Sequence, residues 1–259
     1  MLIAIPDLHG RADLLEAALD YYPSDAKFVS LGDVIDRGPH SRAAVRRFLD
    51  LSDAGRAVLL RGNHEAMLYA AVECNRLWQL TGDHELAQAA NDHFHHWSRN
   101  GGLSVIEEYG GFDAESVPED LIEYLNRTEL TYEVNGYLCA HAAPPVPLPG
   151  YVSTDDVVMW ARPTHGPFTL EPHIKASIHG HTPLTEPTWV GKHLYLDLGA
   201  VQTGALCTLN LENLETVVLQ GSKANGREVL WELVSQQGGL IRPHPAAVIE
   251  VSKRPPVLV

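Results

Sequence analysis

Segments typical of strands and of helices alternate over the first sixty residues, and a polar cluster follows each strand. Short apolar runs at 2–6, 27–31 and 57–60 predict three strands. Between them, apolar residues recur at helical spacing in 11–22 and 41–51. This β-α-β-α-β order predicts a parallel sheet covered by helices, with ligands bound at the carboxyl ends of the strands. We therefore expect an α/β fold.

After residue 60 the predicted secondary structure is first helical and then mostly strand. Apolar residues at helical spacing predict a helical insertion over about 65–126. Strand signals then return at 132–140, 176–178, 193–198, 205–211, 215–219 and 229–234. We expect these later strands to form a second sheet that packs on the first. A single domain over 1–241 is then followed by a proline-rich tail, 242–259.

The composition excludes several classes of protein. Hydrophobic residues make up 45% of the 259, which is enough for a sizeable core and argues against wholesale disorder. Lys and Arg number 19 and Asp and Glu 33, so the net charge of −14 argues against binding to nucleic acids or anionic membranes. No signal peptide and no membrane-spanning apolar run is recognisable. Three cysteines without C-x-x-C spacing indicate reduced thiols, so we expect a cytoplasmic location, while the oligomeric state is left open.

Each of the first three strands is followed by side chains suited to binding metal. Residues two apart in an extended chain point the same way, so Asp7 and His9 can converge on one ion. Two later histidines, His141 and His181, also follow strand-like segments. Carboxylate, imidazole and amide groups without thiolate suit manganese or iron better than structural zinc. The three clusters are Asp7-Leu8-His9-Gly10, Gly32-Asp33-Val34-Ile35-Asp36-Arg37-Gly38 and Arg61-Gly62-Asn63-His64-Glu65.

These clusters, taken in order with His141 and Gly180-His181-Thr182, resemble the motifs of the calcineurin-like metallophosphoesterase superfamily. Within it they are similar to the phosphoprotein phosphatase branch, especially its small bacterial and phage serine/threonine phosphatases. Relatives of that branch include the symmetrical diadenosine tetraphosphate hydrolases. The resemblance implies a four-layer α/β/β/α sandwich with a helical insertion, in which 1–241 is the catalytic domain. The motifs are specific for the superfamily and far less specific for the substrate.

The resemblance also implies a centre of two divalent metal ions, with one carboxylate shared between them. The ligands of the first ion are then Asp7, His9 and Asp33, and those of the second are Asp33, Asn63, His141 and His181. Manganese is the metal we expect, with iron, nickel, zinc or magnesium as alternatives, because such ligand sets accept several ions.

Further residues take catalytic positions by the same resemblance. His64 is the expected general acid for the leaving oxygen, and Asp36 is expected to orient it and favour its protonated form. Arg37 and Arg162 are expected to bind the phosphate, together with Asn63.

Other polar residues carry weaker signals. The stretch Trp97-Ser98-Arg99-Asn100-Gly101-Gly102 is similar to one near the site in the same branch, so Arg99 and Asn100 are candidate substrate contacts. His179 is a candidate spare ligand or supporting partner, whereas Asp197 is interpreted as structural. A solvated helix face is the interpretation for the histidines of the insertion, which are His84, His93, His95 and His96.

Two divalent ions that share a water molecule can activate it for attack, so no protein nucleophile is needed. We therefore expect a serine/threonine phosphatase-like phosphomonoesterase that acts on phosphorylated proteins or peptides. The alternative is a symmetrical hydrolase of dinucleoside polyphosphates, which would use the same centre on a nucleotide substrate. A remote alternative is an inactive binding module, although all the implied metal ligands and His64 are retained.

Overall fold

Two β-sheets stack against each other in the structure, a computed structural model that describes residues 1–221, 232–236 and 249–250. In spatial order, the first sheet of the described residues consists of β12 (Ile249–Glu250), β11 (Glu232–Gln236), β10 (Thr216–Gln220), β9 (Ala205–Asn210), β1 (Leu2–Ile5), β2 (Lys27–Ser30) and β3 (Ala57–Leu59). The second consists of β4 (Thr131–Val134), β5 (Tyr137–Ala140), β6 (Ala176–His179), β8 (His193–Tyr195) and β7 (Thr188–Val190).

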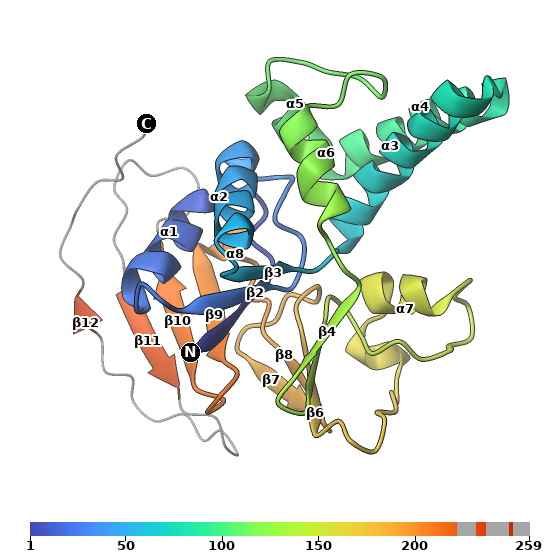
Figure 1. Cartoon of the computed structure of the whole chain (residues 1–259). Helices are drawn as coiled ribbons and strands as arrows, with labels where there is room; N and C mark the ends of the chain where they lie inside the picture. The colour runs from blue at the N-terminus through green and yellow to red at the C-terminus, as the bar shows by residue number, and fades with distance from the viewer. Residues whose placement is uncertain (222–231, 237–248, 251–259) are drawn as a thin grey trace.

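Helices flank the two sheets. Figure 1 shows α1 and α2 along the first sheet, α7 beside the second, and α3 and α4 extending away from both. The bounds are α1 Ala12–Tyr21, α2 Ser41–Asp53, α3 Asn63–Thr81, α4 His84–Trp97, α5 Leu103–Glu108, α6 Glu119–Asn126, α7 Thr154–Trp160 and α8 Ala200–Thr203. This arrangement confirms the four-layer α/β/β/α sandwich.

Strand β1 lies in the middle of the first sheet, and its side chains alternate between two cores. Ile3 and Ile5 belong to the core shared with the flanking helices, whereas Ala4 belongs to the core between the two sheets. All three residues are fully buried, as expected for a strand covered on both faces. Because β1, β2 and β3 are parallel, their carboxyl ends open at one edge of the sheet.

The later strands divide between the sheets, which corrects the prediction that they all form the second one. Strand β9 pairs antiparallel with β1, and β10 and β11 follow it, so these three extend the first sheet. The predicted strand 132–140 is a hairpin, because Asn135 and Gly136 have φ values of 55° and 82° and form a tight turn. The second sheet also contains β7, which the sequence pattern did not indicate.

The helical section between β3 and β4 comprises α3, α4, α5 and α6. The predicted boundary at 241 and most of the proline-rich tail lie outside the described residues. Within the described part of the chain, no helix is both long and apolar enough to cross a membrane.

Candidate active site

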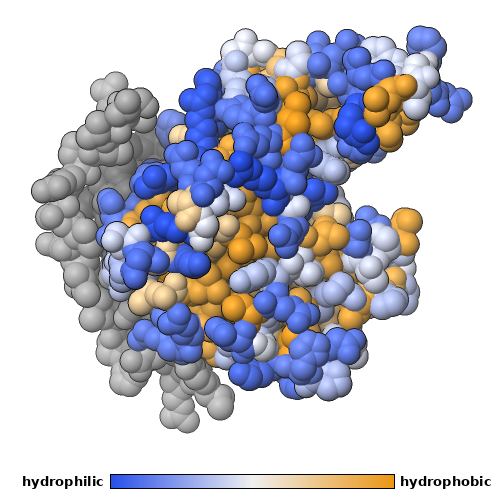
Figure 2. All heavy atoms as spheres, in the orientation of Figure 1, coloured by the Kyte–Doolittle hydropathy of each residue, from blue (hydrophilic) through white to orange (hydrophobic). Residues whose placement is uncertain are grey.

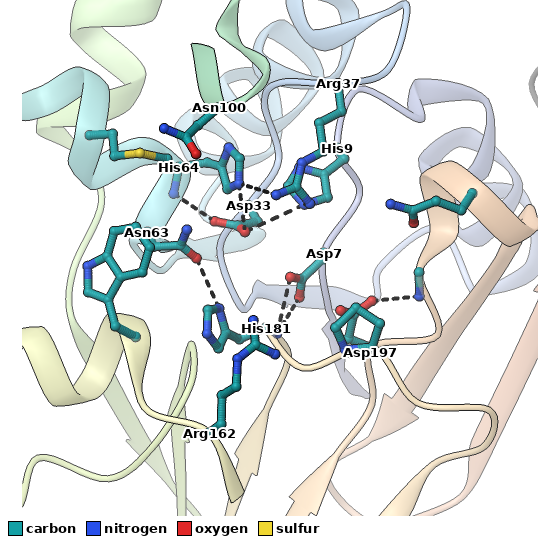
Figure 3. A pocket seen from close by; sticks show the side chains of 15 residues that line it. Asp7, His9, Asp33, Arg37, Asn63, His64, Asn100, Arg162, His181 and Asp197 are labelled. Atoms are coloured by element: carbon teal, nitrogen blue, oxygen red, sulfur yellow. Dashed lines mark hydrogen bonds and ion pairs between the residues drawn. The ribbon is translucent and has the colours of Figure 1, made fainter. Parts of the chain in front are cut away.

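A cavity of about 230 Å³ opens where the carboxyl ends of strands from both sheets meet. Two of its walls come from α3 and α7, the helices on either side of the notch that Figure 2 shows. Figure 3 shows the polar side chains pointing into this space. The cavity is lined by Asp7, His9, Asp33, Arg37, Asn63, His64, Met67, Asn100, Trp160, Arg162, His181, Pro183, Asp197, Gly199 and Gln202.

The backbone around the cavity adopts conformations that side chains rarely take. Of the seven described non-glycine residues with positive φ, five belong to the site, namely His9, Asp33, Asp36, Arg37 and His181. Such strain persists only where surrounding contacts impose it, and it is concentrated at functional sites. Two glycines leave room for carboxylates, because a Cβ at Gly62 would overlap Asp33 and a Cβ at Gly180 would overlap Asp7.

Four predicted ligands of the second ion converge at one point. Nε2 of His141 lies 3.0 Å from Oδ1 of Asn63 and 3.5 Å from Oδ1 of Asp33. Nδ1 of His181 also lies 3.0 Å from the Asn63 oxygen. The outer nitrogen of each ring is occupied, because His141 donates from Nδ1 to the carbonyl of Leu31 and His181 donates to the carbonyl of Trp160.

This geometry fits a bound cation. Burial lowers the pKa of His141 to about 4 and also lowers the pKa of His181, so both rings are neutral. With their other nitrogens donating, both rings direct lone pairs at the oxygen of Asn63. Converging lone pairs repel each other unless a positive charge lies among them, and carbonyl contacts of this kind commonly orient metal-binding histidines.

The first predicted metal position has a different arrangement. His9 donates from Nδ1 to the carbonyl of Ile35, and its Nε2 lies 3.6 Å from Oδ2 of Asp33. The two oxygens of Asp33 therefore face different histidines, as a bridging carboxylate requires. One possible ligand atom each from His9, Asp33 and His64 lie within 4.8 Å of one another. Asp7 is not part of this group.

Asp7 lies in the same cavity beside other carboxylates. Both of its oxygens accept the backbone N–H of His181, at 2.9 and 3.1 Å. Burial raises the pKa of Asp7, and the nearby charges of Asp197 and Asp33 raise it further. A concentration of buried negative charge of this kind is itself a reason for a cation to bind.

On the side of His64 away from the cavity, Asp36 binds its ring and Trp97 in turn binds Asp36. Its Nδ1 donates to Oδ2 of Asp36 at 2.6 Å, and Nε1 of Trp97 donates to both oxygens of Asp36 at 3.0 and 2.9 Å. On the cavity side, Arg37 donates to Nε2 of His64 and to Nε2 of His9, both at 2.8 Å. The fixed orientation agrees with the predicted pairing of His64 and Asp36.

Burial sets the protonation state of His64 and Asp36 in the structure, whereas the predicted protonation of His64 concerns the complex with substrate. Burial lowers the pKa of His64, and the nearby His9 ring and the positive charge of Arg37 lower it further. Burial likewise raises the pKa of Asp36. The Nε2 atom of His64 therefore accepts a hydrogen bond from Arg37 as part of a neutral imidazole.

Glu65 is a supporting residue to which the sequence analysis assigned no role. Its carboxylate accepts the backbone N–H groups of Asp33 at 2.7 Å, Val34 at 2.9 Å and Gly62 at 3.0 Å. These bonds fix the loop after β2 to the start of α3 and thereby place Asp33. The signal was available, because a glutamate three residues into a helix commonly caps its first turn.

The sequence profile of the Calcineurin-like phosphoesterase family matches residues 2–184. The chain belongs to this family. Two groups of side chains in this calcineurin-like phosphoesterase lie close enough together to hold metal ions, namely His9, Asp33 and His64, and Asp33, His141 and His181.

Several proteins are similar to this phosphoesterase. A symmetrical bis(5'-nucleosyl)-tetraphosphatase from Ralstonia nicotianae is 35% identical over 106 residues, which cover 40% of this chain and 38% of the relative. An asymmetrical bis(5'-nucleosyl)-tetraphosphatase from Bacillus thuringiensis is 24% identical over 228 residues, 80% of this chain and 84% of the relative. The chain thus spans less than half the length of the first of these curated relatives.

Two solved structures share the fold. The structure of a candidate diadenosine tetraphosphatase covers 87% of this chain and aligns with 94% of its own, with a TM-score of 0.56 and 19% identity. A protein serine/threonine phosphatase from Saccharomyces cerevisiae covers 93% of this chain and 81% of its own, with a TM-score of 0.52 and 13% identity.

Only some of the remaining candidate residues of this phosphoesterase line the cavity. Arg162 and Asn100 line the cavity, whereas Arg99 is exposed and does not. Asp197, which the sequence analysis treated as structural, also lines the cavity, and burial raises its pKa to about 6.

The other histidines considered in the sequence analysis do not line the cavity. His179 is fully buried and bonds to Ser177 and to the carbonyl of Ala140, so it supports the second sheet. The predicted solvated histidines of the insertion are all exposed, namely His84, His93, His95 and His96.

Proposed function

We propose that this phosphoesterase hydrolyses dinucleoside polyphosphates. The observation that supports the proposal is that curated relatives matching over most of the chain carry the name bis(5'-nucleosyl)-tetraphosphatase. The motifs by themselves favoured a serine/threonine protein phosphatase, and the comparisons favour the nucleotide alternative. The structural similarity to a protein phosphatase, at 13% identity, bears on the fold alone.

The residues of the cavity account for binding of a phosphate chain. Two bound divalent ions, held by the six predicted ligands, would supply the charge that activates a shared water molecule and neutralises the phosphate. Arg37 and Arg162 line the same cavity as five of the six predicted ligands and present guanidinium groups suited to phosphate oxygens. This local positive charge outweighs the overall charge of −14, because most surface carboxylates lie beyond a screening length of about 8 Å.

His64 is the group placed to protonate the leaving oxygen. Arg37 donates a hydrogen bond to its Nε2 atom at 2.8 Å. When Arg37 pairs with a phosphate, Nε2 is released, and the negative charge of the substrate favours its protonation. Asp36 holds the opposite ring nitrogen and stabilises the charged form as it develops. The proton then passes from Nε2 to the departing phosphate.

A substrate comparison tests the proposal. The purified protein is freed of metal by chelation and loaded separately with manganese, iron, nickel, zinc or magnesium. We expect kcat/KM for diadenosine tetraphosphate to exceed that for a phosphoserine peptide by about tenfold or more. Two ADP molecules would indicate symmetrical cleavage, and ATP with AMP would indicate asymmetrical cleavage. A preference for the phosphopeptide would overturn the proposal, and Asp33→Asn controls for contaminating hydrolases.

A further inference from the structure

The cavity has an apolar side that phosphate binding does not explain. Trp160, at the end of α7, and Met67, on α3 one turn after His64, both line it. Among the tryptophans that the structure describes, Trp160 is the most exposed, with an exposed fraction of 38%. An aromatic face that lines a charged cavity offers a surface on which a flat ring of a ligand can stack.

The position of Trp160 is fixed relative to the phosphate-binding groups. Its ring centroid lies 6.5 Å from that of His181, with the two planes nearly perpendicular at 82°. Its backbone carbonyl accepts a hydrogen bond from the same histidine. Arg162 follows two residues later and lines the same cavity. A planar group covalently linked to a bound phosphate can therefore reach the indole.

We propose, on the basis of the function proposed above, that Trp160 stacks on a nucleobase of the substrate and that Met67 contacts the same base. Tryptophan stacks on any base through its aromatic face, and the thioether of methionine packs well against flat rings. Trp160 is thus a specificity-determining residue. It favours nucleotide phosphates over phosphates that lack an aromatic base.

A specificity ratio measures this role. The ratio divides kcat/KM for diadenosine tetraphosphate by kcat/KM for inorganic tripolyphosphate, which has the phosphate chain and no base. We expect Trp160→Leu to lower the ratio about tenfold and Trp160→Phe, which keeps an aromatic face, to lower it about threefold or less. Trp189→Leu makes the same replacement on β7, away from the cavity, and is expected to leave the ratio unchanged.

Equal losses on both substrates would overturn the proposal, because Trp160 would then act only by holding His181. An unchanged ratio in Trp160→Leu would overturn it as well.

A binding measurement separates this inference from the proposed function. Titration calorimetry on the manganese-loaded protein compares α,β-methylene-ADP with methylenediphosphonate, which differ by the nucleoside. We expect Trp160→Leu to weaken only the nucleotide, by about tenfold. If the wild-type protein shows this discrimination but does not cleave diadenosine tetraphosphate, the proposed function fails and the nucleobase site stands. If it cleaves the dinucleotide but Trp160→Leu weakens both ligands equally or neither, the function stands and the nucleobase site is wrong.

Discussion

His64 depends on a partner that lies far from it in the sequence. Asp36 binds both the imidazole of His64 and the indole N–H of Trp97, which is 61 residues away. All three side chains are almost fully buried, so neither the ring nor the carboxylate can rotate freely. At the scale of single residues, the orientation of His64 depends on this line of three side chains.

Replacing His64 with asparagine removes the proposed proton donor without changing a predicted ligand. General acid catalysis contributes about 10²–10⁴-fold to a rate, so we expect kcat to fall within that range. Metal content, measured by mass spectrometry, is expected to stay at the wild-type value. Normal turnover at every pH would exclude His64 from the reaction.

Replacing Trp97 with phenylalanine tests the support of Asp36. The variant keeps most of the apolar volume and loses the N–H group that donates to Asp36 at 2.9 and 3.0 Å. A hydrogen bond to a charged group contributes about 1.5–3 kcal/mol, so we expect a loss of that size in the free energy of unfolding. We also expect a smaller loss of kcat than in His64→Asn. Urea denaturation and steady-state kinetics together check this, and unchanged values in both would contradict it.

The loops after the strands, rather than the strands themselves, position the metal-binding groups. Glu65, in the first turn of α3, binds the loop after β2 through backbone N–H groups. Gly62, just before α3, lets that loop approach closely. At the scale of elements, the geometry of the site therefore depends on how closely these loops pack against one another. We expect a small change in the path of one loop to affect metal binding.

Gly62→Ala is expected to disturb metal binding more than folding. The added methyl group would overlap the carboxylate of Asp33, which must then move. We expect metal content to fall well below that of the wild type. Gly110→Ala is the control, because its Cβ meets no atom within 4 Å and only its positive φ of 81° is strained. That strain costs about 1–2 kcal/mol without touching the site. Equal metal contents in the two variants would contradict this account.

At the scale of the whole molecule, several carboxylates are buried together in the loops at the carboxyl ends of the strands. Burial raises the pKa values of Asp7, Asp33, Asp36 and Glu65, which means that their charged forms are unfavourable in the free protein. A cation that binds only the folded state relieves this cost and stabilises the fold.

Chelation is therefore expected to lower the Tm. An ion present at 100 times its Kd adds about 2.7 kcal/mol of stability. For a chain of this size each kcal/mol shifts the Tm by about 2–4 °C, so we expect a loss of about 5–10 °C per ion. Scanning calorimetry with and without chelator measures it, and Asp33→Asn should show a much smaller difference. A Tm that does not respond to metal in the wild type would contradict a metal centre coupled to folding.

The β-α-β-α-β order and the polar cluster after each strand were predictable because they are local. Helical and strand periods are visible within about ten residues, and parallel strands bring their carboxyl ends together wherever they pair. His9, Asp33 and Asn63 follow neighbouring parallel strands, so their convergence followed from topology. His141 and His181 follow β5 and β6 of the second sheet, so their positions after strand-like segments were also visible, and the family resemblance assigned them to one ion.

Only the tertiary structure decided which sheet β9 and β10 join, and which residues complete the site. The return of β9 to β1 depends on a pairing across some 200 residues, which no local pattern specifies. Trp97 reaches Asp36 because of the way the helical insertion packs. The same packing decides that Asn100 lines the cavity and that Arg99 does not. Such contacts depend on burial and shape summed over the whole molecule, whereas sequence patterns record the preferences of one segment at a time.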